Sequence, residues 1–225
     1  MGKKSVAMNT KWRQHFVDAV EKAYGDLRSV YENHFQNVKR GRAKCGSGLI
    51  EDIFARMVYE NVICADDNYI VLVDWPVTAE GKSQPKYHDF LLCRKQKDGC
   101  LLIVYAADLK TNSGFFRTGI KNVYKTIEDK LSELKDAVGL SSRQILGKEG
   151  KSRFKCSPNA LYDLIIYSSV NNKKECFDSQ VDACNGGNDG SKVVVLCDAV
   201  DRVQTVRSND FTVLEHRLRR QKKIK

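Results

Sequence analysis

Residues 87–112 of the chain read YHDFLLCRKQKDGCLLIVYAADLKTN, two apolar runs separated by a short polar segment. The polar segment contains Asp98-Gly99, a dipeptide typical of tight turns between antiparallel strands. We therefore predict a β-hairpin, with one strand at residues 88–93 and a second at residues 101–112. The other predicted elements are placed around this hairpin.

Three charged residues of the hairpin form a chemically meaningful group. Adjacent strands usually pair, so the hairpin brings Asp89 near Asp108. Alternate residues of a strand share a face, so Asp108 and Lys110 project together while Leu109 points the other way. Converging carboxylates repel each other unless a hard cation such as Mg²⁺ lies between them. A neighbouring ammonium stabilises developing negative charge or orients an attacking water. The pattern favours phosphodiester hydrolysis over the simpler interpretation, in which these charges are solvated strand ends.

The same residues resemble a known nuclease motif. Asp89 is followed, after eighteen residues, by Asp108-Leu109-Lys110, and this layout is similar to the PD-(D/E)XK nuclease superfamily, which includes most type II restriction endonucleases. His88 stands where that family usually has proline. The resemblance implies that Asp89 and Asp108 hold Mg²⁺ and that Lys110 orients or activates the hydrolytic water.

A helix before the hairpin carries a further candidate acid. Residues 49–61 show helical apolar spacing, with Ser47 as the expected N-cap. Glu51 and Asp52 lie in the first turn, where the helix dipole alone would explain them. The resemblance implies a second interpretation for Glu51, as an acid that holds the metal directly or through water. The candidate catalytic residues are thus Asp89, Asp108, Lys110 and Glu51, and the candidate metal ligands are Asp89, Asp108 and Glu51.

Asp74 competes with Asp89 for the role of first catalytic acid. It ends a predicted strand at residues 68–75, which Pro76 is expected to close. Asp89 is preferred because its strand is adjacent in sequence to the strand of Asp108.

The chain has a formal net charge of +10, which favours a polyanionic partner. Basic loops are predicted at residues 39–44 and 141–157, and a basic helix or tail at about residues 211–225. Each is either a solvated surface or a contact to the DNA backbone. The candidate DNA-binding residues are Lys39, Arg40, Arg42, Lys44, Asn112, Arg117, Lys148, Lys151, Arg153, Lys155, Arg219 and Arg220.

The remaining patterns complete an α/β chain. We expect a mixed central β-sheet flanked by α-helices, restriction-endonuclease-like, in a single nuclease domain spanning residues 1–225. Helices are predicted at residues 10–37, 115–137 and 211–225, and strands at 161–168 and 192–199. The two strands are expected to be joined by a glycine-rich loop around residues 185–190.

Composition excludes several classes of protein. Neither a membrane-spanning run nor a signal-peptide core is present, so we expect a cytoplasmic protein without a membrane partner. The eight cysteines do not form Cys-x-x-Cys pairs, and we expect reduced thiols.

The expected function is a Mg²⁺-dependent DNA endonuclease of the type II restriction kind, acting on double-stranded DNA. A palindromic target calls for a homodimer, because a two-fold site is matched by two-fold protein symmetry. A restriction enzyme also implies a cognate DNA methyltransferase acting on the same site. The alternatives are a junction resolvase or repair nuclease, and a non-catalytic nucleic-acid-binding protein in which the acids are structural.

Overall fold

The computed structural model describes residues 10–34, 47–78, 82–112, 119–136, 153–169, 174–186, 190–200 and 203–223. These ranges form a mixed α/β fold, which confirms the predicted class. The elements follow in the order α1 (Lys11–His34), α2 (Ser47–Asn61), β1 (Tyr69–Val77), β2 (Lys86–Lys95), β3 (Leu101–Asn112), α3 (Gly119–Asp136), β4 (Phe154–Ser168), α4 (Lys174–Asn185), β5 (Val193–Val200), β6 (Val203–Val206) and α5 (Ser208–Lys223).

Within the described residues the strands form one six-stranded sheet, in the order β1-β2-β3-β4-β5-β6. β2 is antiparallel to both of its neighbours, β1 and β3. β3, β4 and β5 are parallel, and β6 is antiparallel to β5. Parallel neighbours need a crossover connection, which α3 provides between β3 and β4 and α4 provides between β4 and β5.

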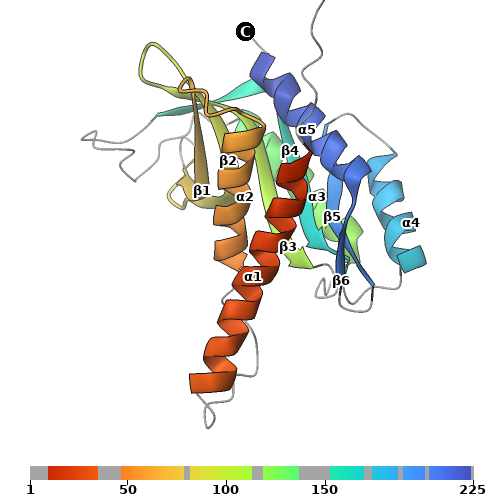
Figure 1. Cartoon of the computed structure of the whole chain (residues 1–225). Coiled ribbons are helices and arrows are strands. Elements are labelled where there is room, and N and C mark those ends of the chain that lie inside the picture. Colours follow the sequence, from red (N-terminus) through yellow and green to blue (C-terminus); the bar gives the residue numbers. More distant parts are fainter. Residues whose placement is uncertain are drawn as a thin grey trace, which may run out of the picture.

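Helices cover both faces of this sheet (Figure 1). Apolar side chains of α1, α2 and α5 pack on one face in a single core that contains Phe16, Phe54 and Phe211. Apolar side chains of α3 and α4 pack on the other face, with Ile127 and Phe177 in a second core. Leu109 belongs to the first core, so the strand alternation predicted for residues 108–110 is confirmed at this position.

The β2–β3 hairpin is confirmed, and its turn has the predicted chemistry. Gly99 adopts a φ of 78°, a conformation that glycine reaches without the steric cost of a Cβ atom. The Asp98 carboxylate accepts a hydrogen bond of 3.0 Å from the backbone N–H of Cys100. The main-chain bond from the N–H of Gln96 to the carbonyl of Cys100, 2.9 Å long, closes the loop.

The structure contains two elements that the sequence did not predict, and the bounds of two strands differ clearly from the prediction. The expected loop after residue 168 contains the helix α4, and β6 was not predicted. β4 begins at Phe154, inside a segment predicted as a basic loop. β1 continues through Pro76 to Val77, because β1 is an edge strand and Pro76 is tolerated there without a ladder N–H.

The C-terminal helix α5 is held to the sheet by a buried ion pair. Arg217 donates from Nη2 to Oδ1 of Asp163 at 2.6 Å and from Nε to Oδ2 at 2.8 Å. The Asp163 carboxylate also accepts from the Tyr105 hydroxyl and from the backbone N–H of Lys192. At residues 208–223 the predicted basic helix or tail is therefore a packed helix.

Two absences apply to the described ranges only. None of the helices there is long and apolar enough to cross a bilayer. The cysteines in those ranges, Cys64, Cys93, Cys100, Cys156, Cys176, Cys184 and Cys197, are free thiols.

Candidate active site

The candidate site lies where β2 and β3 stop pairing. The last aligned pair of the two strands is Phe90 with Ala107, and the next residues along each strand are Asp89 and Asp108. The Oδ2 atom of Asp89 accepts a hydrogen bond of 2.8 Å from the backbone N–H of Leu109. A carboxylate on β2 thus accepts a hydrogen bond from a main-chain N–H of β3, and this contact holds Asp89 beside residues 108–110.

Lys110 lies between the two acids. Its Nζ atom is 3.2 Å from Oδ2 of Asp89 and 4.0 Å from Oδ2 of Asp108, and it also donates to the carbonyl of Leu109. The Lys110 side chain remains 36% exposed, so its ammonium is accessible to a ligand. The structure therefore brings Asp89, Asp108 and Lys110 together as the sequence predicted.

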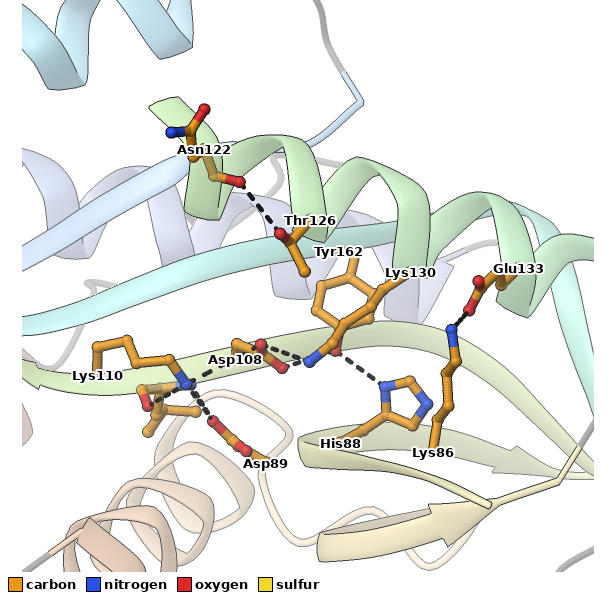
Figure 2. A network of polar contacts seen from close by, with 11 residues as sticks. Lys86, His88, Asp89, Asp108, Lys110, Asn122, Thr126, Lys130, Glu133 and Tyr162 are labelled. Atoms are coloured by element: carbon orange, nitrogen blue, oxygen red, sulfur yellow. Dashed lines mark hydrogen bonds and ion pairs between the residues drawn. The ribbon is translucent and has the colours of Figure 1, made fainter. Parts of the chain in front are cut away.

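Both carboxylate oxygens of Asp108 are engaged (Figure 2). Lys130, on α3, donates to Oδ2 at 2.6 Å, and the hydroxyl of Tyr162, on β4, donates to Oδ1 at 2.8 Å. Burial alone would raise the pKa of Asp108, but Lys130, Lys110 and the Tyr162 hydroxyl outweigh it and lower that pKa. Asp108 is therefore an ionised, hydrogen-bonded carboxylate at neutral pH.

His88, on β2, continues this chain of contacts beyond Tyr162. Its Nδ1 atom lies 2.9 Å from the Tyr162 hydroxyl. Burial, with a further effect from Lys130, lowers the pKa of His88 to about 4, so the ring is neutral at pH 7. The Tyr162 hydroxyl donates its hydrogen bond to Asp108. Nδ1 of His88 must therefore be the donor in the contact between His88 and Tyr162.

Glu51 faces the same acids from α2. Burial is the main cause that raises the pKa of Glu51 to about 7, and the negative charges of Asp89 and Asp74 raise it further. Glu51 and Lys110 line one small pocket between the helices and the sheet. The geometry thus supports a shared site that includes Glu51. The predicted place of Glu51 in the first turn is wrong, because α2 begins at Ser47 and its first turn contains no acidic residue.

Asp74, on β1, does not take part in the two hydrogen bonds that hold Asp89 beside β3. It is exposed and lies at an interruption of the β1–β2 ladder, with a φ of 44°. Its charge acts on Glu51, whereas the backbone N–H of Leu109 and the ammonium of Lys110 donate to Asp89. These contacts favour Asp89 as the first acid.

The donor chemistry of the site fits Mg²⁺. Burial raises the pKa of Asp89 despite the opposing effect of Lys110, and burial raises the pKa of Glu51 as well. The positive charge near these two carboxyls is therefore insufficient to compensate both of them when they are ionised. Mg²⁺ is bound in proteins by one or two such oxygens together with waters and substrate phosphates. Within the described ranges, however, no three His, Cys, Asp or Glu side chains are already grouped around one point. Asp108 could act as a ligand together with Asp89 and Glu51 only if the metal ion replaced Lys130 at its carboxylate.

Most of the predicted DNA contacts lie outside the described residues. These are Lys39, Arg40, Arg42, Lys44, Arg117, Lys148 and Lys151, together with the side chain of Asn112. Arg153, Lys155 and Arg220 are exposed, and Lys155 lies 3.8 Å from Asp98. Arg219 is partly buried and directs Nη2 at the carbonyl of Asn61, 3.5 Å away. Arg219 is therefore less available to DNA than the sequence suggested.

Sequence reasoning did not single out Lys130, Tyr162 or His88 as site residues. In the sequence, Lys130 is one of several polar residues in a predicted helix, and Tyr162 is one of several large residues in a predicted apolar strand. A weak signal was present at His88, which precedes Asp89 in an otherwise apolar strand. The structure is needed to place the three residues around Asp108.

Comparison of the chain with protein-family models and with curated protein sequences finds no match.

Proposed function

We propose that this protein is a Mg²⁺-dependent DNA endonuclease. The observation that carries the proposal is the position of Asp89 and Asp108 at the diverging ends of β2 and β3, with the Lys110 ammonium between them. Two acids and a lysine in this arrangement suit the hydrolysis of a phosphodiester bond, whose transition state gains negative charge.

Each residue has a role that its surroundings support. Asp89 and Glu51, whose pKa values are raised, would hold the cation, and Asp108 would be a third ligand if it gave up its contact to Lys130. Bound Mg²⁺ supplies positive charge to the scissile phosphate. Lys110 orients the attacking water and stabilises charge on the phosphate oxygens, because its ammonium is exposed and already held beside both acids.

The charge of the chain supports a nucleic-acid substrate. A net charge of +10 attracts a phosphate backbone, and binding releases counterions from it. Among DNA endonucleases, a type II restriction enzyme remains our first proposal, with double-stranded DNA as substrate, a homodimer as active form and a cognate methyltransferase as genetic partner. This finer assignment depends on the resemblance of Asp89 and Asp108-Leu109-Lys110 to the PD-(D/E)XK motif.

One experiment tests the activity and the finer assignment together. Unmethylated supercoiled plasmid is incubated with the purified protein and Mg²⁺, and in parallel with excess chelator, and the products are separated on a gel. We expect discrete linear fragments with Mg²⁺ and intact plasmid with chelator. Cutting only of branched or damaged DNA would replace the restriction assignment with a structure-specific nuclease. Absence of any metal-dependent cutting of plain, branched or damaged DNA would overturn the proposal.

A second candidate is a non-catalytic nucleic-acid-binding protein. The observation that favours it is the engagement of both Asp108 oxygens by Lys130 and Tyr162, an arrangement that also stabilises a fold without any metal. The two candidates differ in one measurement. A binding protein would retain DNA affinity in chelator and never cut, whereas the nuclease cuts when Mg²⁺ is restored.

A further inference from the structure

The turn of the β2–β3 hairpin and the start of β4 carry four exposed cations. Lys95 ends β2, Lys97 lies in the turn, Arg153 immediately precedes β4, and Lys155 is the second residue of β4. Lys95 pairs with Leu101 of β3, and the backbone N–H of Leu101 donates to the carbonyl of Arg153. Three neighbouring strands thus bring these cations to the same end of the sheet, and we call the four residues the hairpin-end surface.

The acids near this surface compensate only part of its charge. Asp98, in the turn, lies 3.8 Å from Lys155. The loop before β1 reaches the same end of the sheet, because the N–H of Lys95 donates to the carbonyl of Asn68. Around these contacts lie six cations and three acids: Arg94, Lys95, Lys97, Arg153, Lys155 and Lys222, against Asp66, Asp67 and Asp98. Three positive charges are therefore in excess.

The neighbouring segments do not remove this excess. The last two residues of α3, Lys135 and Asp136, carry opposite charges and cancel. Residues 137–152, which lead to Arg153 in the sequence, contain three cations and one acid: Arg143, Lys148, Lys151 and Glu149. The sequence of this segment therefore adds positive charge next to Arg153 and does not neutralise it.

Three cations of the hairpin-end surface are available to a ligand. Within the described ranges, Lys95, Lys97 and Arg153 form no ion pair, whereas Lys155 is paired with Asp98. The surface is also distinct from the candidate active site. Lys95 is six residues beyond Asp89 on β2, which is about 20 Å at about 3.3 Å per residue. The cations and the acids thus lie at opposite ends of the hairpin.

The polarity of the surface favours a nucleic acid over a protein or a membrane. In the part of the chain that the structure describes, the exposed large apolar side chains are Leu49, Tyr87 and Val213, and none of them belongs to this surface. Protein interfaces usually have an apolar centre, and a membrane surface is bound through apolar side chains together with cations. A phosphate backbone is bound mainly by lysine and arginine charges, which is what this surface offers.

We infer that the hairpin-end surface binds the phosphate backbone of a nucleic acid at a place separate from the candidate active site. Lys95, Lys97 and Arg153 each neutralise a phosphate group. Contacts of this kind fix the position of the nucleic acid and do not read its sequence. The inference goes beyond the proposed function, because a nucleic-acid-binding protein without catalysis would use the same surface.

Fluorescence anisotropy with a labelled DNA duplex of mixed sequence tests this surface without cleavage, in buffer with chelator and at several salt concentrations. The wild-type chain is compared with the triple variant Lys95→Gln, Lys97→Gln and Arg153→Gln. At about 0.1 M salt we expect the triple variant to bind at least tenfold more weakly. The slope of log affinity against log salt should be shallower by about 2–3, because each lost phosphate contact removes about 0.9. Equal affinity and equal slope would overturn the inference.

A matched variant separates a local contact from the effect of net charge. It removes three exposed cations outside the hairpin-end surface, through Lys22→Gln, Arg56→Gln and Lys86→Gln. Its net charge equals that of the triple variant, and it should bind DNA nearly as tightly as the wild type. Equal weakening in both variants would overturn the inference. Circular dichroism with thermal melting confirms the fold of each variant, since all six substituted residues are exposed.

A competition experiment separates nucleic acid from other polyanions. Polyglutamate and unlabelled duplex, matched in total charge, are each used to displace the labelled duplex from the wild-type protein. We expect the unlabelled duplex to be the much stronger competitor. Equal displacement by polyglutamate would overturn the assignment to nucleic acid and indicate an acidic protein partner.

The plasmid assay separates this inference from the proposed function. Cutting of plasmid by the wild type, together with unchanged DNA affinity in the triple variant, would overturn the surface and leave the nuclease proposal intact. Loss of affinity in the triple variant of a protein that never cuts would support the surface and overturn the nuclease proposal.

Discussion

The Nζ atom of Lys130 on α3 lies 2.6 Å from Oδ2 of Asp108 on β3, and this ion pair joins the crossover helix to the strand that carries the candidate site. Tyr162 donates to the other oxygen of Asp108 from the neighbouring parallel strand. The acid is thus held from two directions, and its negative charge is compensated before any ligand arrives. A change at Lys130 should therefore affect both stability and metal binding.

Removal of the negative charge of Asp108 should abolish DNA cleavage, and removal of the positive charge of Lys110 should reduce it strongly. We expect Asp108→Asn to reduce Mg²⁺-dependent cutting to background, because the amide is a poorer cation ligand. Lys110→Met should lower the rate by about 10²–10³-fold, a typical loss for one group that stabilises transition-state charge. The rates come from plasmid cleavage, and DNA affinity in chelator is measured in parallel and should stay close to that of the wild type. Asp129→Asn, an exposed acid of α3, is the control; wild-type cutting by Asp108→Asn would contradict the assignment.

Replacement of Lys130 should make the protein more responsive to Mg²⁺. In Lys130→Gln, Asp108 loses its closest cationic partner, and the free energy of unfolding should fall by about 1–3 kcal/mol. A cation that takes the place of the ammonium would restore part of this loss. We therefore expect millimolar Mg²⁺ to raise the melting temperature of Lys130→Gln by more than that of the wild type. Lys125→Gln, an exposed position on the same helix, should respond as the wild type does; an equal response of Lys130→Gln would argue against metal binding by Asp108.

The pKa of Glu51 predicts a pH dependence of stability. The carboxyl titrates at about 7 in the folded protein, raised mainly by burial, and near its ordinary 4.5 when unfolded. Between these values the folded state binds more protons, so this group makes the protein less stable as pH rises. We expect the melting temperature measured in chelator to fall more steeply from pH 5 to pH 8 in the wild type than in Glu51→Gln.

Magnesium should reverse that trend if Glu51 is a metal ligand. Below pH 7 the ion must displace a proton from Glu51, whereas at pH 8 it meets a carboxylate. The stabilisation by Mg²⁺ should thus be larger at pH 8 than at pH 6 in the wild type, and this difference should shrink in Glu51→Gln. Glu60→Gln, which changes an exposed acid at the far end of α2, should retain the wild-type profile. Identical profiles for the wild type and Glu51→Gln would remove Glu51 from the site.

The ion pair between Arg217 and Asp163 should dominate the attachment of α5. The Arg217 side chain is 10% exposed and Asp163 is fully buried, so Arg217→Met leaves an uncompensated charge inside the protein. We expect a loss of about 3–5 kcal/mol in the free energy of unfolding, measured by urea denaturation. Arg220→Met removes an exposed cation of the same helix and should change stability by no more than about 0.5 kcal/mol. A similar small change for Arg217→Met would show that α5 is attached mainly by its apolar contacts.

Local patterns in the sequence were sufficient for the hairpin and for most of the elements. The predicted strand at residues 101–112 coincides with β3, because an unbroken apolar run bounded by a turn requires no distant information. The same holds for the turn at Asp98-Gly99, whose conformation depends on glycine itself. The pairing of Asp89 with the region of Asp108 also followed, because strands that are neighbours in sequence usually pair.

Weak or short patterns were insufficient. The helix α4 has few apolar positions, Phe177 and Val181 among them, and the glycine-rich segment after it suggested a loop. The four residues of β6 are too few for any periodicity, and they are ordered as a strand by pairing with β5. Phe154 was assigned to a basic loop because its lysine and arginine neighbours hid the start of β4.

The partners of Asp108 were decided only by the tertiary structure. The sequence determined that Asp108 and Lys110 share a face of β3, since that follows from the two-residue period of a strand. Lys130 and Tyr162 lie 22 and 54 residues further along the chain, and they meet Asp108 because α3 crosses over to place β4 parallel to β3. Likewise, Arg217 is just one cation among several in the C-terminal sequence, and it becomes a buried structural residue because Asp163 lies opposite it. Contacts of this kind depend on packing between distant segments, which no local period encodes.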